Sequence, residues 1–288
     1  MTTSGATSSA KADDVLAAQP RALIVTVYGM YARESAGWFS IASLIRLMAG
    51  LGVDEPAVRS AISRLKQRGM LESGRRDGVA GYGLSSRGSQ MLARGDRRIF
   101  QRPAAAAADR WLIVVFSVPE HERARRHTLR SRLSWLGFGT VAAGVWIAPA
   151  HLAGETRDVL AADDLAGYVS LFTAGDLAFG DIREKIGQWW DLDRLAELYQ
   201  AFIDAASPVL RQWQDGPPAE VGVRAFNDYV RVLTAWRRLP FLDPGLPAEL
   251  LPADWRGARA VELFLHLRDL LGEPARRYVR AVISQPAK

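Results

Sequence analysis

The sequence predicts a multidomain α+β protein, because three different patterns follow one another along its 288 residues. Residues 20–100 alternate short amphipathic helices with a glycine-rich hairpin, and residues 111–180 alternate apolar strands with helices. Residues 181–288 have helical periodicity almost throughout. Residues 1–19 are small and polar, which predicts a disordered tail. Residues 101–110 contain five consecutive alanines and are expected to be a linker.

Composition and charge exclude some kinds of site and indicate one kind of partner. The chain has no cysteine, which excludes disulfides and thiolate metal sites and favours a reducing, cytoplasmic location. No apolar run approaches the roughly 18 residues of a membrane span. Residues 20–110 hold fifteen lysines and arginines against seven aspartates and glutamates, a net charge of +8, whereas residues 111–288 carry −1. Such a local excess indicates a polyanionic partner.

The stretch 54–69 contains the start and stop signals of a helix. Asp54 is a typical N-cap, Pro56 is tolerated in the first turn, and Gly69 can end the helix in a left-handed conformation. One face is an apolar stripe of Val58, Ala61, Ile62 and Leu65. The opposite face carries Arg59, Ser60, Ser63, Lys66 and Gln67, with Arg64 at its edge. These groups suit base edges and phosphates, although an isolated basic helix is more often a solvated face.

The neighbouring segments favour the DNA-reading alternative. Residues 21–31 fit a strand or a buried helix and are assigned as a first helix, and Ser40 can cap a second helix over 41–49. A tight turn at 50–53 completes a helix-turn-helix. A predicted hairpin follows, with Arg75 and Arg76 in a glycine-rich tip at 74–81. This order is that of a winged helix-turn-helix domain.

A further helix is predicted up to residue 100. Its basic end, residues 94–98, is expected to be solvated. The middle part reads as strands over 111–118, 140–148 and 168–173, with helices over 121–136 and 152–162, which indicates a ferredoxin-like α+β module.

The last part predicts a helical domain. Residues 186–203 mark one amphipathic helix and residues 223–238 another, and two closing helices are expected over 261–271 and 275–283. A proline-rich passage at 240–247 separates them.

Three motifs resemble the PaaX-type transcriptional repressors, which regulate phenylacetate degradation genes. They are residues 58–65 followed by Gly69-Met70-Leu71, the run Trp135-Leu136-Gly137-Phe138-Gly139, and residues 242–257. The resemblance extends over about residues 20–283. It implies a sequence-specific repressor that binds double-stranded DNA as a homodimer at a near-palindromic operator, and that phenylacetyl-CoA releases. The third helix would then enter the major groove, Arg64 would reach phosphate, and Arg75 and Arg76 would anchor the wing.

The resemblance also directs the search for an effector site. An aromatic acyl-CoA needs cations for its phosphates and an apolar slot for its acyl group. Two sets of residues offer both kinds of group, Trp236 with Arg237 and Arg238, and Arg183 and Lys185 before Trp189 and Trp190. The alternative for each set is an amphipathic helix with a basic outer face.

The middle module is also similar to small CRISPR-associated endonucleases, which carry a metal-binding aspartate at the end of the first strand. Ser117 stands at that place here, and a serine hydroxyl is a poor Mg²⁺ ligand. The four histidines show no metal-binding spacing. We therefore expect no enzyme activity, no metal site and no cofactor apart from the effector. The alternatives are a metal-dependent nuclease, or a nucleic-acid-binding protein without an effector.

Overall fold

The computed structural model describes residues 15–101, 105–106, 110–175, 180–216 and 218–285. Most of the expected tail and six residues of the expected linker lie outside this part. The α+β class predicted from the sequence is confirmed, with two small antiparallel sheets and a helical C-terminal part. In the described residues, no helix is long and apolar enough to cross a membrane.

The chain forms two compact units, each assembled from separated segments. The first unit combines Met1–Gly95, Tyr199–Arg237 and Gly257–Lys288. The second combines Asp96–Leu198 and Arg238–Arg256. The first unit therefore joins helices from the two ends of the chain.

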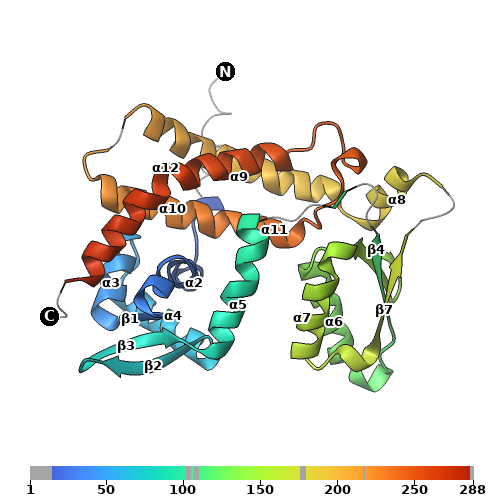
Figure 1. Cartoon of the computed structure of the whole chain (residues 1–288), viewed down its shortest axis with the longest axis horizontal. Coiled ribbons are helices and arrows are strands. Elements are labelled where there is room, and N and C mark those ends of the chain that lie inside the picture. Colours follow the sequence, from blue (N-terminus) through green and yellow to red (C-terminus); the bar gives the residue numbers. More distant parts are fainter. Residues whose placement is uncertain (1–14, 102–104, 107–109, 176–179, 217, 286–288) are drawn as a thin grey trace. The chain divides into compact units, whose positions relative to one another are not determined.

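The N-terminal part of the first unit contains helices and a three-stranded sheet. In chain order its elements are α2 (Pro20–Tyr31), β1 (Trp38–Ser40), α3 (Ile41–Gly50), α4 (Glu55–Gln67), β2 (Leu71–Arg76), β3 (Val79–Leu84) and α5 (Ser86–Asp96) (Figure 1). The segment that fitted strand or helix is thus helical, as α2. Ser40 caps α3 as predicted, since its hydroxyl oxygen accepts a hydrogen bond from the Ser43 N–H at 3.0 Å.

The turn of the hairpin is shorter than the sequence predicts. The expected glycine-rich tip over 74–81 is wrong, because β2 and β3 stay paired up to Arg76 and Val79. The turn consists only of Asp77 and Gly78, which both have positive φ, at 49° and 78°. An Asp-Gly pair suits such a turn, and it matches the twist of the flanking strands. Strand β1 pairs with β3, which gives the sheet order β1-β3-β2.

The second unit contains a four-stranded antiparallel sheet of order β5-β6-β4-β7. Its elements are β4 (Trp111–Phe116), α6 (Arg123–Trp135), β5 (Gly139–Ala142), β6 (Val145–Pro149), α7 (Ala153–Ala162) and β7 (Val169–Ala174). This β-α-β-β-α-β order is of the ferredoxin-like type. The single strand expected over 140–148 is wrong, because Gly144 at φ 80° turns the chain between β5 and β6. From the sequence alone, an apolar run that contains a glycine is easily assigned to a single strand.

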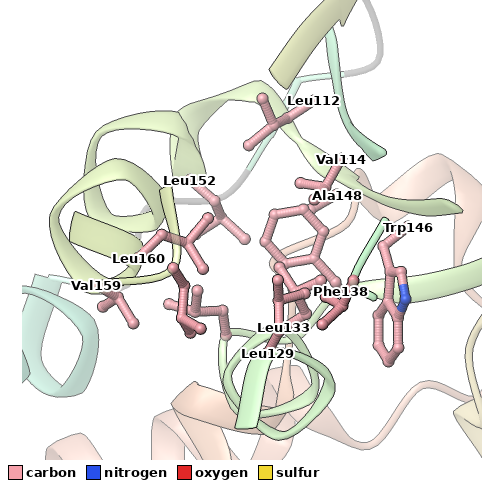
Figure 2. Packing of buried hydrophobic residues seen from close by; sticks show 13 residues of the cluster. Leu112, Val114, Leu129, Leu133, Phe138, Trp146, Ala148, Leu152, Val159 and Leu160 are labelled. Carbon is pink, nitrogen blue, oxygen red and sulfur yellow. The ribbon is translucent and has the colours of Figure 1, made fainter. Parts of the chain in front are cut away.

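Each face of this sheet packs against a different core. Helices α6 and α7 cover one face, where Leu129 and Leu133 meet strand residues such as Val114 and Trp146 (Figure 2). On the other face, Trp111 and Ile147 pack with Ile186 and Trp190, around helix α8 (Ile182–Trp189).

The remaining helices differ from the prediction in two places. They are α9 (Leu192–Gln214), α10 (Val221–Trp236), α11 (Leu239–Leu242) and α12 (Gly257–Ile283). The helix expected over 186–203 is split, because Trp190 is extended and Asp191 caps α9 through the Arg194 N–H. The two closing helices form one, α12, which continues through Pro274. Buried Leu271 and Ala275 keep the helix packed on both sides of that proline.

Arg98 is an unexpected buried cation in the second unit. Its side chain is 5% exposed, although the basic end 94–98 was expected to be solvated. Its Nε donates to Glu155 Oε2 at 2.8 Å, and its two terminal nitrogens donate to the carbonyl oxygens of Leu136 at 2.8 Å and Phe241 at 3.2 Å. Burial lowers the pKa of the Arg98 guanidinium, and the Glu155 carboxylate opposes that shift. Arg98 therefore ties the return segment 238–256 to α6 and α7.

Replacing Arg98 by methionine should destabilise the second unit by about 3–5 kcal/mol, because the Glu155 carboxylate, whose side chain is only 14% exposed, loses its partner. Urea unfolding followed by circular dichroism measures this change. Exposed Arg97→Met is the matched control and should stay within about 0.5 kcal/mol. Equal losses of unfolding free energy in the two variants would contradict the role of Arg98 in holding these segments together.

Candidate nucleic-acid interface

Helix α4 has the cap, core face and exposed face that its sequence predicts. The Asp54 carboxylate accepts a hydrogen bond from the Ala57 N–H at 2.8 Å, and Gly69 follows the helix with φ 67°. The buried residues of the helix are Val58, Ala61, Ile62 and Leu65. The predicted DNA-reading residues all lie exposed on the rest of its surface: Arg59, Ser60, Ser63, Arg64, Lys66 and Gln67.

These exposed side chains differ in their contacts. Arg59 Nε donates to Glu55 Oε1 at 2.8 Å, one turn earlier on the helix. Such an exposed pair is worth less than about 1 kcal/mol, so another hydrogen-bond acceptor can replace Glu55 as the partner of Arg59. Lys66 Nζ lies 5.7 Å from the centre of the Tyr82 ring on β3. Within the described residues, the other four side chains have no hydrogen bond or ion pair.

The hairpin arginines lie on β2, next to each other in sequence. Successive strand residues point to opposite faces, so Arg75 and Arg76 cannot serve the same surface. Arg75 donates to the Gly78 carbonyl oxygen at 3.3 Å. Arg76 donates to the Ala36 carbonyl oxygen at 3.0 Å, and its guanidinium lies 5.5 Å from the centre of the Trp38 ring. Both arginines are exposed, and the structure holds each in a defined position.

Two aromatic residues that the sequence did not single out position these cations. Trp38 on β1 holds Arg76, and Tyr82 on β3 lies under Lys66. Tyr82 also links the hairpin to α2, since its carbonyl oxygen accepts a hydrogen bond from the Tyr28 hydroxyl at 2.9 Å. Burial raises the pKa of Tyr28, so this hydroxyl stays a donor. The pattern Gly81-Tyr82-Gly83 was the available signal, because glycines opposite Trp38 leave room for its ring.

The predicted effector residues fall in different units. Arg183, Lys185 and Trp189 lie on α8 in the second unit, where Arg183 is exposed and Trp189 is half-buried. Arg238 also belongs to the second unit and is exposed. In the first unit, Trp236 has no exposed surface.

The surroundings of Trp236 and Arg237 are those of a packed core. The Trp236 ring stacks on Phe264 with centres 4.7 Å apart. Arg237 donates to the Ala22 carbonyl oxygen at 3.3 Å. Within the first unit, Trp236 and Arg237 are thus engaged in packing and hydrogen bonding, and the α8 residues belong to the second unit.

Ser117, which stands where the resemblance to small CRISPR-associated endonucleases would place an aspartate, follows β4. It is exposed, and its N–H donates to the Tyr168 carbonyl oxygen at 3.1 Å. No cluster of three or more histidines, aspartates or glutamates suited to a metal ion occurs among the described residues.

Comparisons with known proteins match nearly the whole chain. Three family models match: "PaaX-like protein" over residues 19–88, "PaaX protein central Cas2-like domain" over 104–186, and "PaaX-like protein C-terminal domain" over 190–281. Transcriptional repressor PaaX of Escherichia coli (strain K12) is 26% identical over 260 residues, which cover 89% of this chain and 82% of that protein. The solved structure of uncharacterized protein Rv0674 from Mycobacterium tuberculosis is 27% identical. It has a TM-score of 0.55 and covers 88% of this chain and 99% of that chain.

Gly81→Ala should distort the hairpin, because an added Cβ would lie 2.2 Å from the Trp38 ring and 2.3 Å from the Phe39 carbonyl oxygen. We expect a loss of about 1–3 kcal/mol in unfolding free energy, as for other overpacked sites. Gly74 pairs with Gly81 across the hairpin and has no atom within 4 Å of its own Cβ position. Gly74→Ala is therefore the control, and a similar loss in both variants in urea unfolding would contradict the packing argument.

Proposed function

Because the chain belongs to the PaaX-like protein family, we propose that it is a DNA-binding transcriptional repressor. The observation that carries the proposal is the exposed basic and hydroxyl face of α4 beside a basic hairpin, in a chain related to a transcriptional repressor. The order helix, strand, two helices and hairpin supports a winged helix-turn-helix assignment for residues 20–96. The protein then acts as a regulator in the cytoplasm and not as an enzyme.

In this mechanism α4 enters the major groove of the operator. Arg59, Ser60, Ser63, Lys66 and Gln67 face the base edges, and Arg64 reaches the phosphate backbone. On the hairpin, Arg76 lies against Trp38 and binds the DNA backbone or the minor groove. Arg75 projects from the opposite face of the hairpin. A homodimer places two copies of α4 on the half-sites of a near-palindromic operator.

The DNA contacts are tested with Arg59→Ala, Arg64→Ala and Arg76→Ala in fluorescence-anisotropy titrations on operator and random DNA. The operator is first obtained by selecting bound fragments from genomic DNA. Loss of the base-reading Arg59 should cost roughly 1–3 kcal/mol and relax specificity. Loss of Arg64 or Arg76 should weaken binding to every sequence and lower the salt slope by about one.

Arg211→Ala is the control for these titrations. It removes one exposed positive charge from α9 in the same unit and should leave binding unchanged. Wild-type affinity in the Arg59, Arg64 and Arg76 variants would refute the assigned interface.

We also propose that an aromatic acyl-CoA, such as phenylacetyl-CoA, releases the protein from DNA. The supporting observation is the family, together with exposed cations that lie close to aromatic residues in the sequence. Arg183 precedes half-buried Trp189 on α8, and exposed Arg238 precedes α11. Buried Trp236 can take part only if α10 and α12 separate around it.

The effector is tested by thermal unfolding with phenylacetyl-CoA and with free CoA as the control. A specific ligand at a hundred times its dissociation constant should stabilise the protein by about 2.7 kcal/mol. If Arg183→Ala abolishes the shift and Arg238→Ala does not, α8 holds the phosphates, and the reverse result favours α11. Operator binding with no response to either compound would support a repressor without this effector.

A further inference from the structure

We infer that Asn227 and Arg231 of α10 are positioning residues for DNA recognition. They hold the turn between α3 and α4 and thereby set the direction in which α4 leaves that turn. The inference rests on the proposed function, because it assigns α4 the task of reading DNA.

Two backbone carbonyl oxygens of the turn accept no hydrogen bond from the turn itself. Helix α3 ends at Gly50, and a helix leaves its last carbonyl oxygens without partners inside the helix. The local hydrogen bonds of the turn run from the N–H groups of Leu51, Gly52 and Val53 back to Met48 and Ala49. They satisfy donors of the turn and leave the carbonyl oxygens of Gly50 and Leu51 available to other segments.

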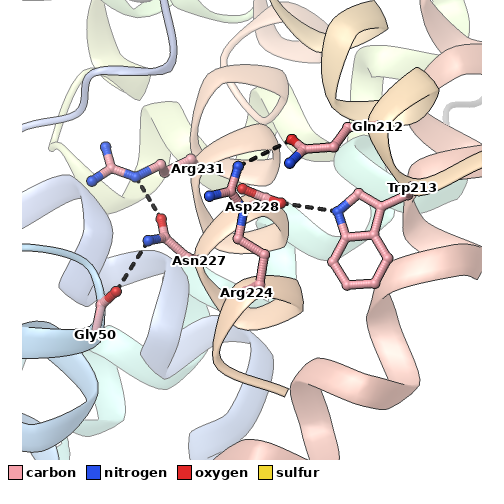
Figure 3. Close-up of polar contacts among 7 residues, drawn as sticks. All are labelled: Gly50, Gln212, Trp213, Arg224, Asn227, Asp228 and Arg231. Atoms are coloured by element: carbon pink, nitrogen blue, oxygen red, sulfur yellow. Dashed lines mark hydrogen bonds and ion pairs between the residues drawn. The ribbon is translucent and has the colours of Figure 1, made fainter. Parts of the chain in front are cut away.

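Side chains of α10 fill these two places. Asn227 Nδ2 donates to the Gly50 carbonyl oxygen at 3.1 Å (Figure 3). A terminal nitrogen of Arg231 donates to the Leu51 carbonyl oxygen at 2.7 Å. Arg231 Nε also donates to Asn227 Oδ1 at 2.7 Å, so each end of the Asn227 amide has a defined partner. The positive charge of Arg231 lies at the negative end of the α3 dipole, which favours this arrangement.

Helix α10 is firmly held on its other contacts, so it can serve as a fixed support. Buried Asp228 accepts a hydrogen bond from Trp213 Nε1 of α9 at 2.9 Å. Near its C-terminal end, the hydroxyl oxygens of Thr234 and Thr26 lie 2.8 Å apart in the buried contact with α2. These contacts leave α10 little freedom to follow a movement of the turn.

Close packing also fixes the turn from α12. A Cβ added to Gly50 would lie 3.3 Å from the Tyr278 hydroxyl oxygen of α12 and 3.6 Å from Val223 Cγ2 of α10. Helix α4 starts only four residues after Leu51, at Glu55, so the position of the turn determines where Arg59 and Ser60 project. Base reading needs side chains placed within about 0.5 Å, and a loosened turn does not hold them so closely.

The test compares Arg231→Ala with Arg224→Ala on the same helix. Each substitution removes one positive charge and two side-chain hydrogen bonds, but the bonds of Arg224 go to Asp228 and Gln212 and do not reach the turn. We expect Arg231→Ala and Asn227→Ala to weaken operator binding about tenfold, because bonds to charged or buried groups carry energies of that order. Binding to random DNA and its salt slope should match those of Arg224→Ala, since no phosphate contact is lost.

Two further measurements separate positioning from general stability. Arg231→Lys keeps the charge at the end of α3 and one donor for Leu51, so it should recover part of the operator affinity. Amide hydrogen exchange at residues 51–58 should speed up in Arg231→Ala and stay unchanged in Arg224→Ala, without DNA.

The outcomes distinguish the inference from the proposed function. If the unaltered protein selects no operator, the proposed function fails and the inference fails with it. If the unaltered protein binds an operator and the Arg231 and Arg224 variants lose affinity equally, or neither loses affinity, only the inference is overturned.

Discussion

Burial of one apolar stripe on α4 is the constraint from which the proposed DNA interface follows. Val58, Ala61, Ile62 and Leu65 fix the rotation of the helix about its own axis, because side chains repeat every 3.6 residues. The hydroxyl, amide and cationic side chains between them must then face solvent. Asp54 at one end and Gly69 at the other fix the length of this face. A substitution within the stripe would therefore act on DNA binding through the orientation of the whole helix.

The stripe fixes rotation, and polar contacts with distant segments fix where the helix points. Tyr28 of α2 holds the hairpin through the Tyr82 carbonyl, and α10 holds the turn through Asn227 and Arg231. The last two contacts join residues 177 and 180 positions apart. Helices α10 and α12 consequently belong to the same compact unit as α4. A ligand that moved α10 would change the support of the turn before it changed any group that meets DNA.

The accuracy of the sequence predictions follows the range of the interactions involved. Both ends and the buried face of α4 were predicted correctly, because all the residues that determine them lie within 16 positions of the sequence. The strand over 140–148 was wrong where Gly144 adopts a positive φ, and the division of α12 was wrong because flanking core residues outweigh one proline. The burial of Arg98 was missed since its partners come from three separate segments. The contacts of Arg231 with the turn have no local pattern, so sequence reasoning placed it only within an amphipathic helix.

The structure also changes the meaning of the positive charge counted from the sequence. Of the fifteen cations in residues 20–110, Arg98 is buried in the second unit, Arg46 donates to carbonyl oxygens near the end of α12, and Arg59 pairs with Glu55. The number of cations that a polyanion meets without displacing another contact is thus smaller than fifteen. Fewer available cations reduce the salt-dependent, sequence-independent part of the affinity for DNA. The neutral groups of Ser60, Ser63 and Gln67, which have no internal partner within the described residues, then account for a larger share of recognition. That share depends on their exact placement, and therefore on the contacts that hold the turn before α4.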